Sequence, residues 1–272
     1  MKTRKTTAKS LHSITSKDGT RIAYEKHGNG PALVLVPGAL CDRNCASMPR
    51  LVALLAKSFA VYQFDRRGKG DSGDTQPYSV DREIEDIDAF IDKAGGKSYL
   101  YGHSSGGALA LEAAARLGDK VKRLALYEVP YNDDPTAQNA WKDYIHQLTE
   151  LLAAGRNGDA VALFMRYTGV PAGQIEGIRH APFWPGMEAM AQTLAYDHTT
   201  ILGETAAIPV KTAARIAVPT LVMSGAFSYP FMHQTARTLS RTIPHARLMM
   251  LEGQTHDVTP EALAPVLAEF FL

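Results

Sequence analysis

A serine between two glycines constrains this chain more than any other feature. Gly102, Ser104 and Gly106 follow a short apolar run that begins at Tyr99, and an Ala- and Leu-rich helical pattern comes after them. This order predicts a strand, a tight turn with the serine at its tip, and a helix. The glycines leave room where the strand and the helix pass each other closely. The N-terminus of the helix then points at the serine, where its free N–H groups favour developing negative charge.

Strand and helix patterns alternate on both sides of this turn. Asp18-Gly19 predicts the turn of a hairpin at 13–25. Continuous apolar runs such as 32–36 are typical of strands that are buried on both faces. The alternation predicts an α/β fold in which helices cover both faces of a mostly parallel sheet. The other predicted strands are 59–64, 121–127, 219–224 and 246–251, and the helices outside the middle of the chain are 49–57, 81–94, 231–241 and 260–271.

The alternation stops in the middle of the chain. From Tyr131 to about Arg215 only helical patterns occur, and prolines and glycines interrupt them. Three helices are expected there, at 137–154, 160–167 and 186–196. The predicted domains are the first part of an α/β core at 1–130, an all-helical insertion at 131–215, and the second part of the core at 216–272.

Charge and cysteine content argue against several kinds of partner. The 272 residues carry a net charge of +1, so nothing draws the chain to nucleic acid or to an acidic membrane surface. The first ten residues are basic, but no apolar segment follows them, so we interpret them as a solvated tail rather than a signal peptide. Cys41 and Cys45 are too few for a disulfide framework or a zinc site. We therefore expect two reduced thiols in a cytoplasmic protein that holds no metal.

With these motifs in place, the chain resembles the α/β-hydrolase superfamily over nearly its whole length. The resemblance rests on the turn at 36–38, the polar loop from Asp65 to Ser72, the serine turn, the helical insertion, and the run from Gly253 to His256. It implies an α/β-hydrolase fold, an insertion that caps the active site, and a triad in the order nucleophile, acid, histidine. The loop from Asp65 to Ser72 is expected to be scaffold rather than site.

The resemblance implies that Ser104 is the nucleophile and His256 the base. A serine hydroxyl is a weak nucleophile at neutral pH and needs an adjacent base. His256 lies in the loop after the last strand, where the family places its histidine. We expect His103, beside the nucleophile, to be structural. His180 and His198 lie in the insertion, where either could touch substrate, although solvent exposure or packing is the simpler interpretation.

The triad acid is where this chain departs from the common pattern. Most family members carry an aspartate where Ser228 stands here, and a serine cannot supply the charge that stabilises a histidinium. Glu128 ends the preceding predicted strand, 24 positions after the nucleophile. In haloalkane dehalogenases and zearalenone-lactonase-like hydrolases the acid is a glutamate at the same separation. We therefore assign the acid to Glu128 and keep Asp257 and Glu252 as alternatives.

Backbone N–H groups are expected to hold the oxyanion. The resemblance implies one donor from Ser105 and one from Ala39, with Leu40 as the near alternative; Pro37 has no N–H and cannot donate. Leu40 and Trp184 are the candidates for substrate contact. Trp184 and its neighbour Phe183 lie between two prolines, a pattern that does not fit a helix and suggests a pocket wall.

These assignments predict a cofactor-free serine hydrolase that cleaves an ester or lactone of an apolar small molecule through an acyl-enzyme. A dehalogenase or an epoxide hydrolase needs an aspartate nucleophile, so Ser104 argues against both. A hydrolase or lyase that breaks a C–C bond with the same triad, or a ligand sensor that turns over slowly, stays open. The expected partner is a small-molecule substrate, with neither nucleic acid nor membrane, and a homodimer is left open.

Overall fold

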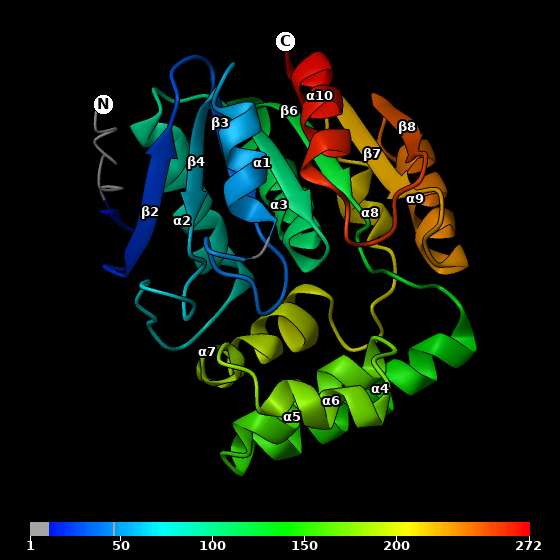
Figure 1. Ribbon diagram of the computed structural model, residues 1–272. Coiled ribbons are helices and arrows are strands. Elements are labelled where there is room, and N and C mark those ends of the chain that lie inside the picture. The colour runs from blue at the N-terminus through cyan, green and yellow to red at the C-terminus, as the bar shows by residue number, and fades with distance from the viewer. Residues whose placement is uncertain (1–10, 46) are drawn as a thin grey trace, which may run out of the picture.

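Eight strands form one sheet in the order β1-β2-β4-β3-β5-β6-β7-β8 (Figure 1). The computed structural model describes residues 11–45 and 47–272. Strands β1 and β2 pair antiparallel with each other, β2 pairs antiparallel with β4, and all the other neighbours are parallel. The predicted mostly parallel sheet is confirmed. The strands are β1 (His12–Thr15), β2 (Arg21–His27), β3 (Ala32–Val36), β4 (Ala60–Phe64), β5 (Ser98–His103), β6 (Val121–Tyr127), β7 (Thr220–Gly225) and β8 (Ala246–Leu251).

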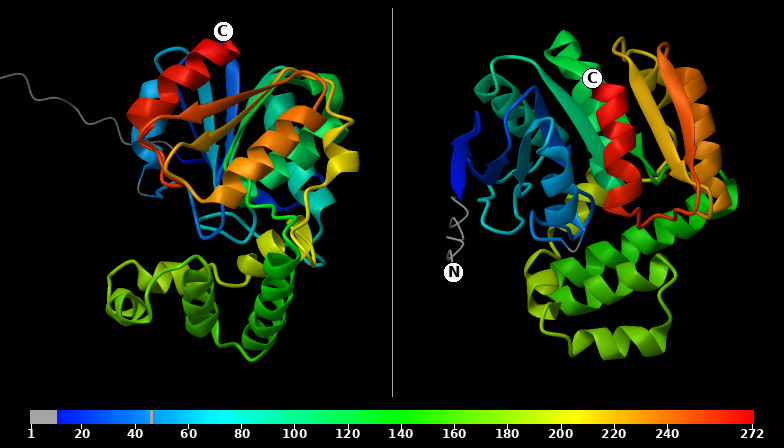
Figure 2. Two further views of the ribbon diagram at one scale, coloured as in Figure 1. Left: turned by 90° about the vertical axis from the view of Figure 1, so that its right-hand side faces the viewer. Right: turned by 45° about the horizontal axis from the view of Figure 1, so that its top comes forward.

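Helices cover both faces of this sheet, as the view along its edge in Figure 2 shows. Side chains that alternate along β3 belong to two separate cores. Leu33 and Leu35 pack with α1 (Met48–Leu55) and α10 (Pro260–Phe271), whereas Val34 and Val36 pack in the core on the other face. A strand buried on both faces needs apolar residues at every position, which explains the continuous apolar run. The helices of the second face are α2 (Val80–Lys93), α3 (Ser105–Leu117) and α9 (Pro230–Thr242).

The chain between β6 and β7 is helical, and most of it forms a cap beyond one end of the sheet (Figure 1). We call α4 to α7 and η2 the cap; α8 (Val210–Ala213) instead packs against α3 and α9. The pattern at 186–196 was wrong as a single helix, because the chain turns between α7 and η2. Pro185 stands in the first turn of α7, where its missing N–H is tolerated, so Trp184 begins a helix after all. The cap elements are α4 (Pro135–Ala153), α5 (Asn157–Tyr167), α6 (Ala172–Arg179), α7 (Trp184–Ala189) and the π-helix η2 (Ala195–Ile201).

The loop after β3 contains a disulfide. The structure joins Cys41 and Cys45 in a disulfide, so the expectation of two reduced thiols is wrong. The two residues are four positions apart in the loop after β3, and that loop brings their Cα atoms to 5.3 Å, within the range that a disulfide spans.

The basic tail expected at 1–10 lies outside the described residues. Among the described helices, none is both long and apolar enough to cross a membrane.

The serine turn is built on a close approach of three backbone segments. Gly102 is the last residue but one of β5, and Gly106 lies in the first turn of α3. A Cβ added to Gly106 would lie 2.4 Å from the carbonyl oxygens of both Val36 and Pro37, and one added to Gly102 would lie 2.5 Å from the carbonyl oxygen of Gly106. Real Cβ atoms do not come that close to backbone oxygens, so both positions need glycine.

We predict that Gly106→Ala destabilises the protein by about 3 kcal/mol or more, because the methyl group overlaps two backbone oxygens that cannot rotate away. Urea unfolding measures the loss. Gly177→Ala in α6 is the matched control, since nothing lies within 4 Å of its added Cβ. Alanine is the better helix former there, so this variant gains up to about 1 kcal/mol. Equal stability of the two variants would show that the turn has room for a side chain.

Candidate active site

Ser104 occupies the tip of the turn between β5 and α3 in a strained conformation. Its φ is 56°, in a region that residues with a side chain rarely adopt. The Ser104 N–H donates to the Tyr127 carbonyl at 2.9 Å, and the Gly107 N–H donates to the Ser104 carbonyl at 2.8 Å. These bonds tie the turn to β6 on one side and to α3 on the other. The conformation therefore persists because its surroundings hold it in place, as is common at functional sites.

His256 lies in the loop after β8, with its side chain about one-third exposed. Its Nδ1 is 2.9 Å from Oε2 of Glu128. Because a carboxylate only accepts hydrogen bonds, Nδ1 carries the proton, and Nε2 of the neutral ring is left free to accept one. The His256 ring centre lies 5.0 Å from that of His103, the neighbour of Ser104. In the described part of the chain the Ser104 hydroxyl makes no hydrogen bond, a gap that is common before substrate binds.

Glu128 is a buried carboxylate with four hydrogen-bond donors. It directly follows β6 with a φ of 47°, and only 2% of the residue is exposed. Oε1 accepts from the Ser224 hydroxyl at 2.9 Å and from the Gly225 N–H at 2.8 Å. Oε2 accepts from the Ser228 hydroxyl at 2.8 Å and from His256. Burial raises the pKa of the Glu128 carboxyl, but the bonds from His256, Ser228, Gly225 and Ser224 outweigh it and hold the pKa below its usual range.

The structure therefore brings Glu128, and not the alternative acids, to the histidine. Asp257 and Glu252 are exposed. Ser228, which stands where relatives carry the aspartate, donates to the same carboxylate oxygen that holds His256. The side chains at the two possible positions for the acid thus meet at one carboxylate oxygen. Ser228 cannot itself be the acid, and instead it donates a hydrogen bond to Glu128, which takes that role here.

Two side chains from the central strands hold the loop that carries His256. His103 Nε2 lies 3.1 Å from the His256 carbonyl oxygen, and the Tyr127 hydroxyl donates to the Thr255 carbonyl at 2.5 Å. Burial lowers the pKa of His103 to about 3, so its ring is neutral at physiological pH, and Nε2 donates to the carbonyl as N–H. His103 is positioned to act structurally, as the sequence suggested.

The expected oxyanion donors lie on two segments that meet at Ser104. Ser105 is the first residue of α3, and the first N–H of a helix has no acceptor within it. The loop after β3, which leads to Ala39, passes beside the nucleophile, since a Cβ added to Gly38 would lie 3.6 Å from the Ser104 hydroxyl oxygen. Leu40 follows with a φ of 50° and is 9% exposed within the core. The placement suits Ala39 and Ser105 as donors and leaves Leu40 little surface for substrate.

A cluster of buried charges beside the segment at 37–39 was missed by the sequence analysis. Arg66 and Lys69 both bind Asp197 of η2, with Lys69 Nζ 3.0 Å from Oδ2, and Arg66 also pairs with Glu83 of α2. Burial raises the pKa of Asp197, but Arg66 and Lys69 outweigh it and hold the pKa well below its usual range. The crowding of charges between glycines at 65–71 was the one available signal. The pairing with residue 197 has no trace in the sequence.

The cap residues singled out from the sequence lie in different surroundings. Trp184 is 5% exposed, packs in the apolar core, and has the Arg179 guanidinium 5.3 Å above its ring. His180 is exposed. His198 is 3% exposed, and its Nδ1 lies 2.8 Å from the Tyr144 hydroxyl. Burial lowers the pKa of His198 to about 4, so it is neutral at physiological pH. Substrate contact by Leu40 and Trp184 stays a prediction.

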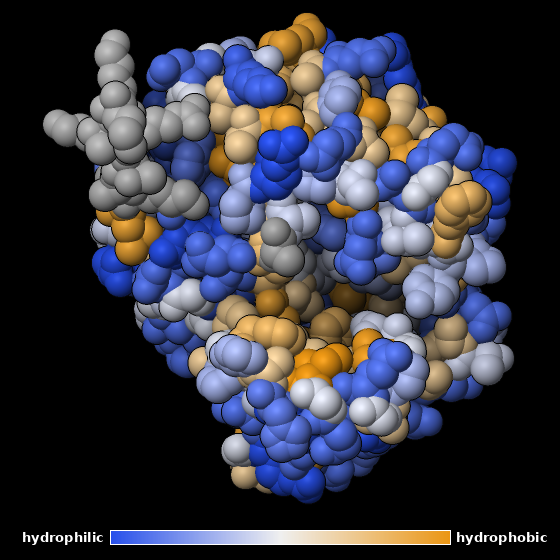
Figure 3. All heavy atoms as spheres, viewed as in Figure 1, coloured by the Kyte–Doolittle hydropathy of each residue, from blue (hydrophilic) through white to orange (hydrophobic). Residues whose placement is uncertain are grey.

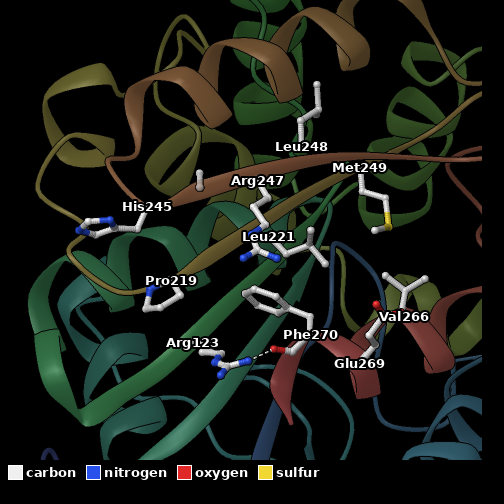
Figure 4. A pocket seen from close by; sticks show the side chains of 11 residues that line it. Arg123, Pro219, Leu221, His245, Arg247, Leu248, Met249, Val266, Glu269 and Phe270 are labelled. Carbon is white, nitrogen blue, oxygen red and sulfur yellow. Dashed lines mark hydrogen bonds between the residues drawn. The ribbon is translucent and has the colours of Figure 1, made fainter.

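The described surface has several hollows. Figure 3 shows one between the α/β body and the cap, with apolar side chains inside it. A second, of about 630 Å³, lies against β8 and α10, where Figure 4 shows Leu221, Leu248 and Phe270 around it. There Arg123 donates to the carbonyl of Phe270. Among the residues that line this second hollow, none is an expected site residue.

Comparisons with known proteins agree with the fold. The sequence model of the alpha/beta hydrolase family matches residues 33–269. A crystal structure of an alpha/beta hydrolase from Sphaerobacter thermophilus is 48% identical, with a TM-score of 0.85 over 96% of this chain and 100% of that one. An enol-lactonase from Burkholderia xenovorans shares the fold at 24% identity, with a TM-score of 0.67 over 96% of this chain and 99% of that one.

Curated relatives match a shorter segment. A zearalenone hydrolase from Cladophialophora bantiana is 28% identical over 134 residues, which is 47% of this chain and 50% of the relative. A proline iminopeptidase from Pestalotiopsis fici is 29% identical over 114 residues, 40% of this chain and 41% of that protein. The chain thus spans about half the length, or less, of the curated relatives that it matches.

We predict that Glu128→Gln lowers kcat by about 10⁴-fold, as the matching change does in a serine protease, because glutamine lacks the charge that stabilises the histidinium. Steady-state hydrolysis of a p-nitrophenyl ester measures the loss. Asp257→Asn is the matched control and keeps near-normal activity. Ser228→Ala costs a few-fold at most, since Glu128 retains three of its four donors.

A second substitution probes the place where these two side chains meet. Ser228→Asp in the Glu128→Gln background recovers part of the lost rate, because the side chain at 228 reaches the carboxylate oxygen that holds His256. Normal activity of Glu128→Gln together with collapse of Asp257→Asn would move the acid to the final loop.

Proposed function

The chain belongs to the alpha/beta hydrolase family, and from that premise we propose that it is a serine hydrolase that cleaves an ester or lactone of an apolar small molecule. The observation that carries the proposal is the hydrogen bond between His256 Nδ1 and the buried Glu128 carboxylate. It leaves the other nitrogen of the ring able to take a proton. Nucleophilic catalysis by serine needs this arrangement of base and orienting acid.

The proposed reaction has two halves. The Ser104 oxygen attacks the carbonyl carbon while its proton passes to His256 Nε2, and the N–H groups of Ala39 and Ser105 hold the resulting oxyanion. Collapse of that intermediate expels the alcohol, which takes the proton from His256, and leaves an acyl group on Ser104. Water then attacks the acyl group with His256 as base, which releases the acid and restores the serine. In a lactone the alcohol and the acid are parts of one product.

The substrate class rests on three observations of different kinds. The hollow between the body and the cap has apolar side chains inside it, which suits a substrate that is mostly apolar (Figure 3). One curated relative is described as a zearalenone hydrolase. The position of Glu128 after β6, shared with zearalenone-lactonase-like hydrolases, favours lactones over simple esters.

The partners and the location belong to the same proposal. A small-molecule substrate is the only partner that the reaction requires besides water, and a homodimer stays an open expectation. The expectation of a cytoplasmic location was tied to reduced thiols, and the disulfide between Cys41 and Cys45 removes that support. The location therefore stays a prediction.

We predict that Ser104→Ala abolishes hydrolysis, with a loss near the ~10⁶-fold scale known for removal of a serine nucleophile, while the fold persists. Incubation with a fluorophosphonate followed by peptide mass spectrometry locates the reactive serine. A panel of p-nitrophenyl esters and aryl-substituted macrocyclic lactones then measures turnover. Ser240→Ala is the matched control and labels and turns over normally, because the Ser240 hydroxyl in α9 bonds only the Arg237 carbonyl.

The outcomes separate the proposal from its alternatives. Labelling at Ser104 together with rapid ester turnover supports the serine hydrolase. Labelling at another residue contradicts the assignment of the nucleophile. Binding of lactones with almost no turnover of any ester favours a ligand sensor of the same fold.

A further inference from the structure

Two buried cations hold the carbonyl groups of the segment that carries the expected oxyanion donor. Lys69 Nζ donates to the Gly38 carbonyl at 3.0 Å, and Arg66 Nη1 donates to the Pro37 carbonyl at 3.3 Å. Both side chains are only 1% exposed. No step of the proposed reaction uses either cation, so their burial beside this segment needs another explanation.

The geometry of the peptide unit links Lys69 to the reaction. The carbonyl of Gly38 and the N–H of Ala39 belong to one planar trans peptide, so they point in opposite directions. A cation that holds the carbonyl oxygen thereby fixes the direction of the Ala39 N–H. The same cation polarises the peptide and strengthens that N–H as a donor. This peptide adjoins the nucleophile, since a Cβ added to Gly38 would lie 3.1 Å from the Ser104 Cβ.

The cap supplies the anion that seats the lysine. Asp197 of η2 binds Lys69 through Oδ2 at 3.0 Å and Arg66 through Oδ1 at 2.5 Å. Arg66 in turn forms two bonds to the Glu83 carboxylate, at 2.6 and 2.7 Å. The four side chains balance two positive against two negative charges, and none is more than 2% exposed. Buried ions of this kind persist only when each is paired and hydrogen-bonded.

We propose that Lys69 is a positioning residue that aims the Ala39 N–H at the oxyanion, and that Asp197 makes this aim depend on the seating of the cap. The inference rests on the proposed function, because an oxyanion must form at Ser104. Lys69 touches neither the nucleophile nor the base, and it acts through the peptide between Gly38 and Ala39. An oxyanion donor works only if it is in place before the charge develops, and a salt bridge buried away from water supplies that rigidity.

The test replaces Lys69 with methionine, which keeps most of the length of the side chain and removes its charge. With p-nitrophenyl butyrate, kcat is expected to fall about 10- to 100-fold while KM stays within about 2-fold. Loss of a whole oxyanion donor costs about 10²–10³ in kcat, and here the donor is only misaimed. Binding of an alkyl trifluoromethyl ketone, whose adduct with Ser104 carries the oxyanion, weakens by the same factor. Binding of 1-butanol, which is neutral and forms no adduct with Ser104, is unchanged.

Arg67→Met is the matched control, because Arg67 lies in the same loop and is equally buried. Its partners are Asp86, Asp18 and the carbonyl of Arg82, and none of these partners belongs to the segment at 37–39. This variant loses stability, but its kcat per active site stays at the wild-type value. Active sites are counted in every preparation by end-point labelling with a fluorophosphonate, so a partly unfolded sample still yields kcat for the folded molecules.

Three further variants separate the direction of the Ala39 N–H from the balance of buried charges. Lys69→Met combined with Asp197→Asn removes one positive and one negative charge, and it shows the same fall in kcat as Lys69→Met with a higher stability. Asp197→Asn alone keeps the lysine but loosens its seat, and gives a smaller fall. Lys69→Arg, whose guanidinium can still bind both oxygens, recovers part of the rate.

The outcomes distinguish this proposal from the function on which it rests. Wild-type kcat in Lys69→Met, or an equal fall in Arg67→Met, overturns the role of Lys69 and leaves the hydrolase intact. A fall in kcat without weaker ketone binding also overturns it, because the oxyanion is then unaffected. A wild-type protein that neither hydrolyses esters nor labels at Ser104 overturns both.

Discussion

The burial of one carboxylate organises the candidate active site. Glu128 is almost fully withdrawn from water, so its charge is tolerable only because four donors surround it. Three of those donors come from the end of β7 and the residues after it, and the fourth is His256. The requirement to satisfy a single buried charge therefore joins the end of β6, the end of β7 and the final loop into one unit. The orientation of the base is a by-product of that requirement.

The order of the strands makes this convergence possible. In the sheet β5 lies between β3 and β6, with Gly102 opposite Val36 on one side and Leu126 on the other. The ends of these strands bring the oxyanion segment, the serine turn and the acid to the same edge of the sheet. Glycines at 102 and 106 then let β5, α3 and the end of β3 approach one another more closely than any side chain at these positions would allow. Steric exclusion and hydrogen bonding thus act on the same few residues.

The cap is joined to this arrangement by charge as well as by apolar contact. Asp197 is the cap residue that meets Arg66 and Lys69, and those two cations meet the carbonyls of Pro37 and Gly38. A helical layer that only covered the hollow would need no buried ion pairs. These ion pairs link the position of the cap to the position of the segment at 37–39. Loss of any one partner leaves another buried charge unpaired.

The sequence by itself determined the features that depend on neighbours along the chain. Periodicity and the glycine pattern predicted the sheet, its helices and the turn at Ser104, because burial on both faces and a tight turn each restrict residue type locally. The separation of Glu128 from Ser104 pointed to the acid through resemblance. Only the tertiary structure decided that Ser228 donates to that acid and that Cys41 and Cys45 join. It alone also decided the pairing of Asp197 with Lys69. A contact across more than a hundred positions depends on how the layers pack, and the residues around each partner carry no pattern that predicts it.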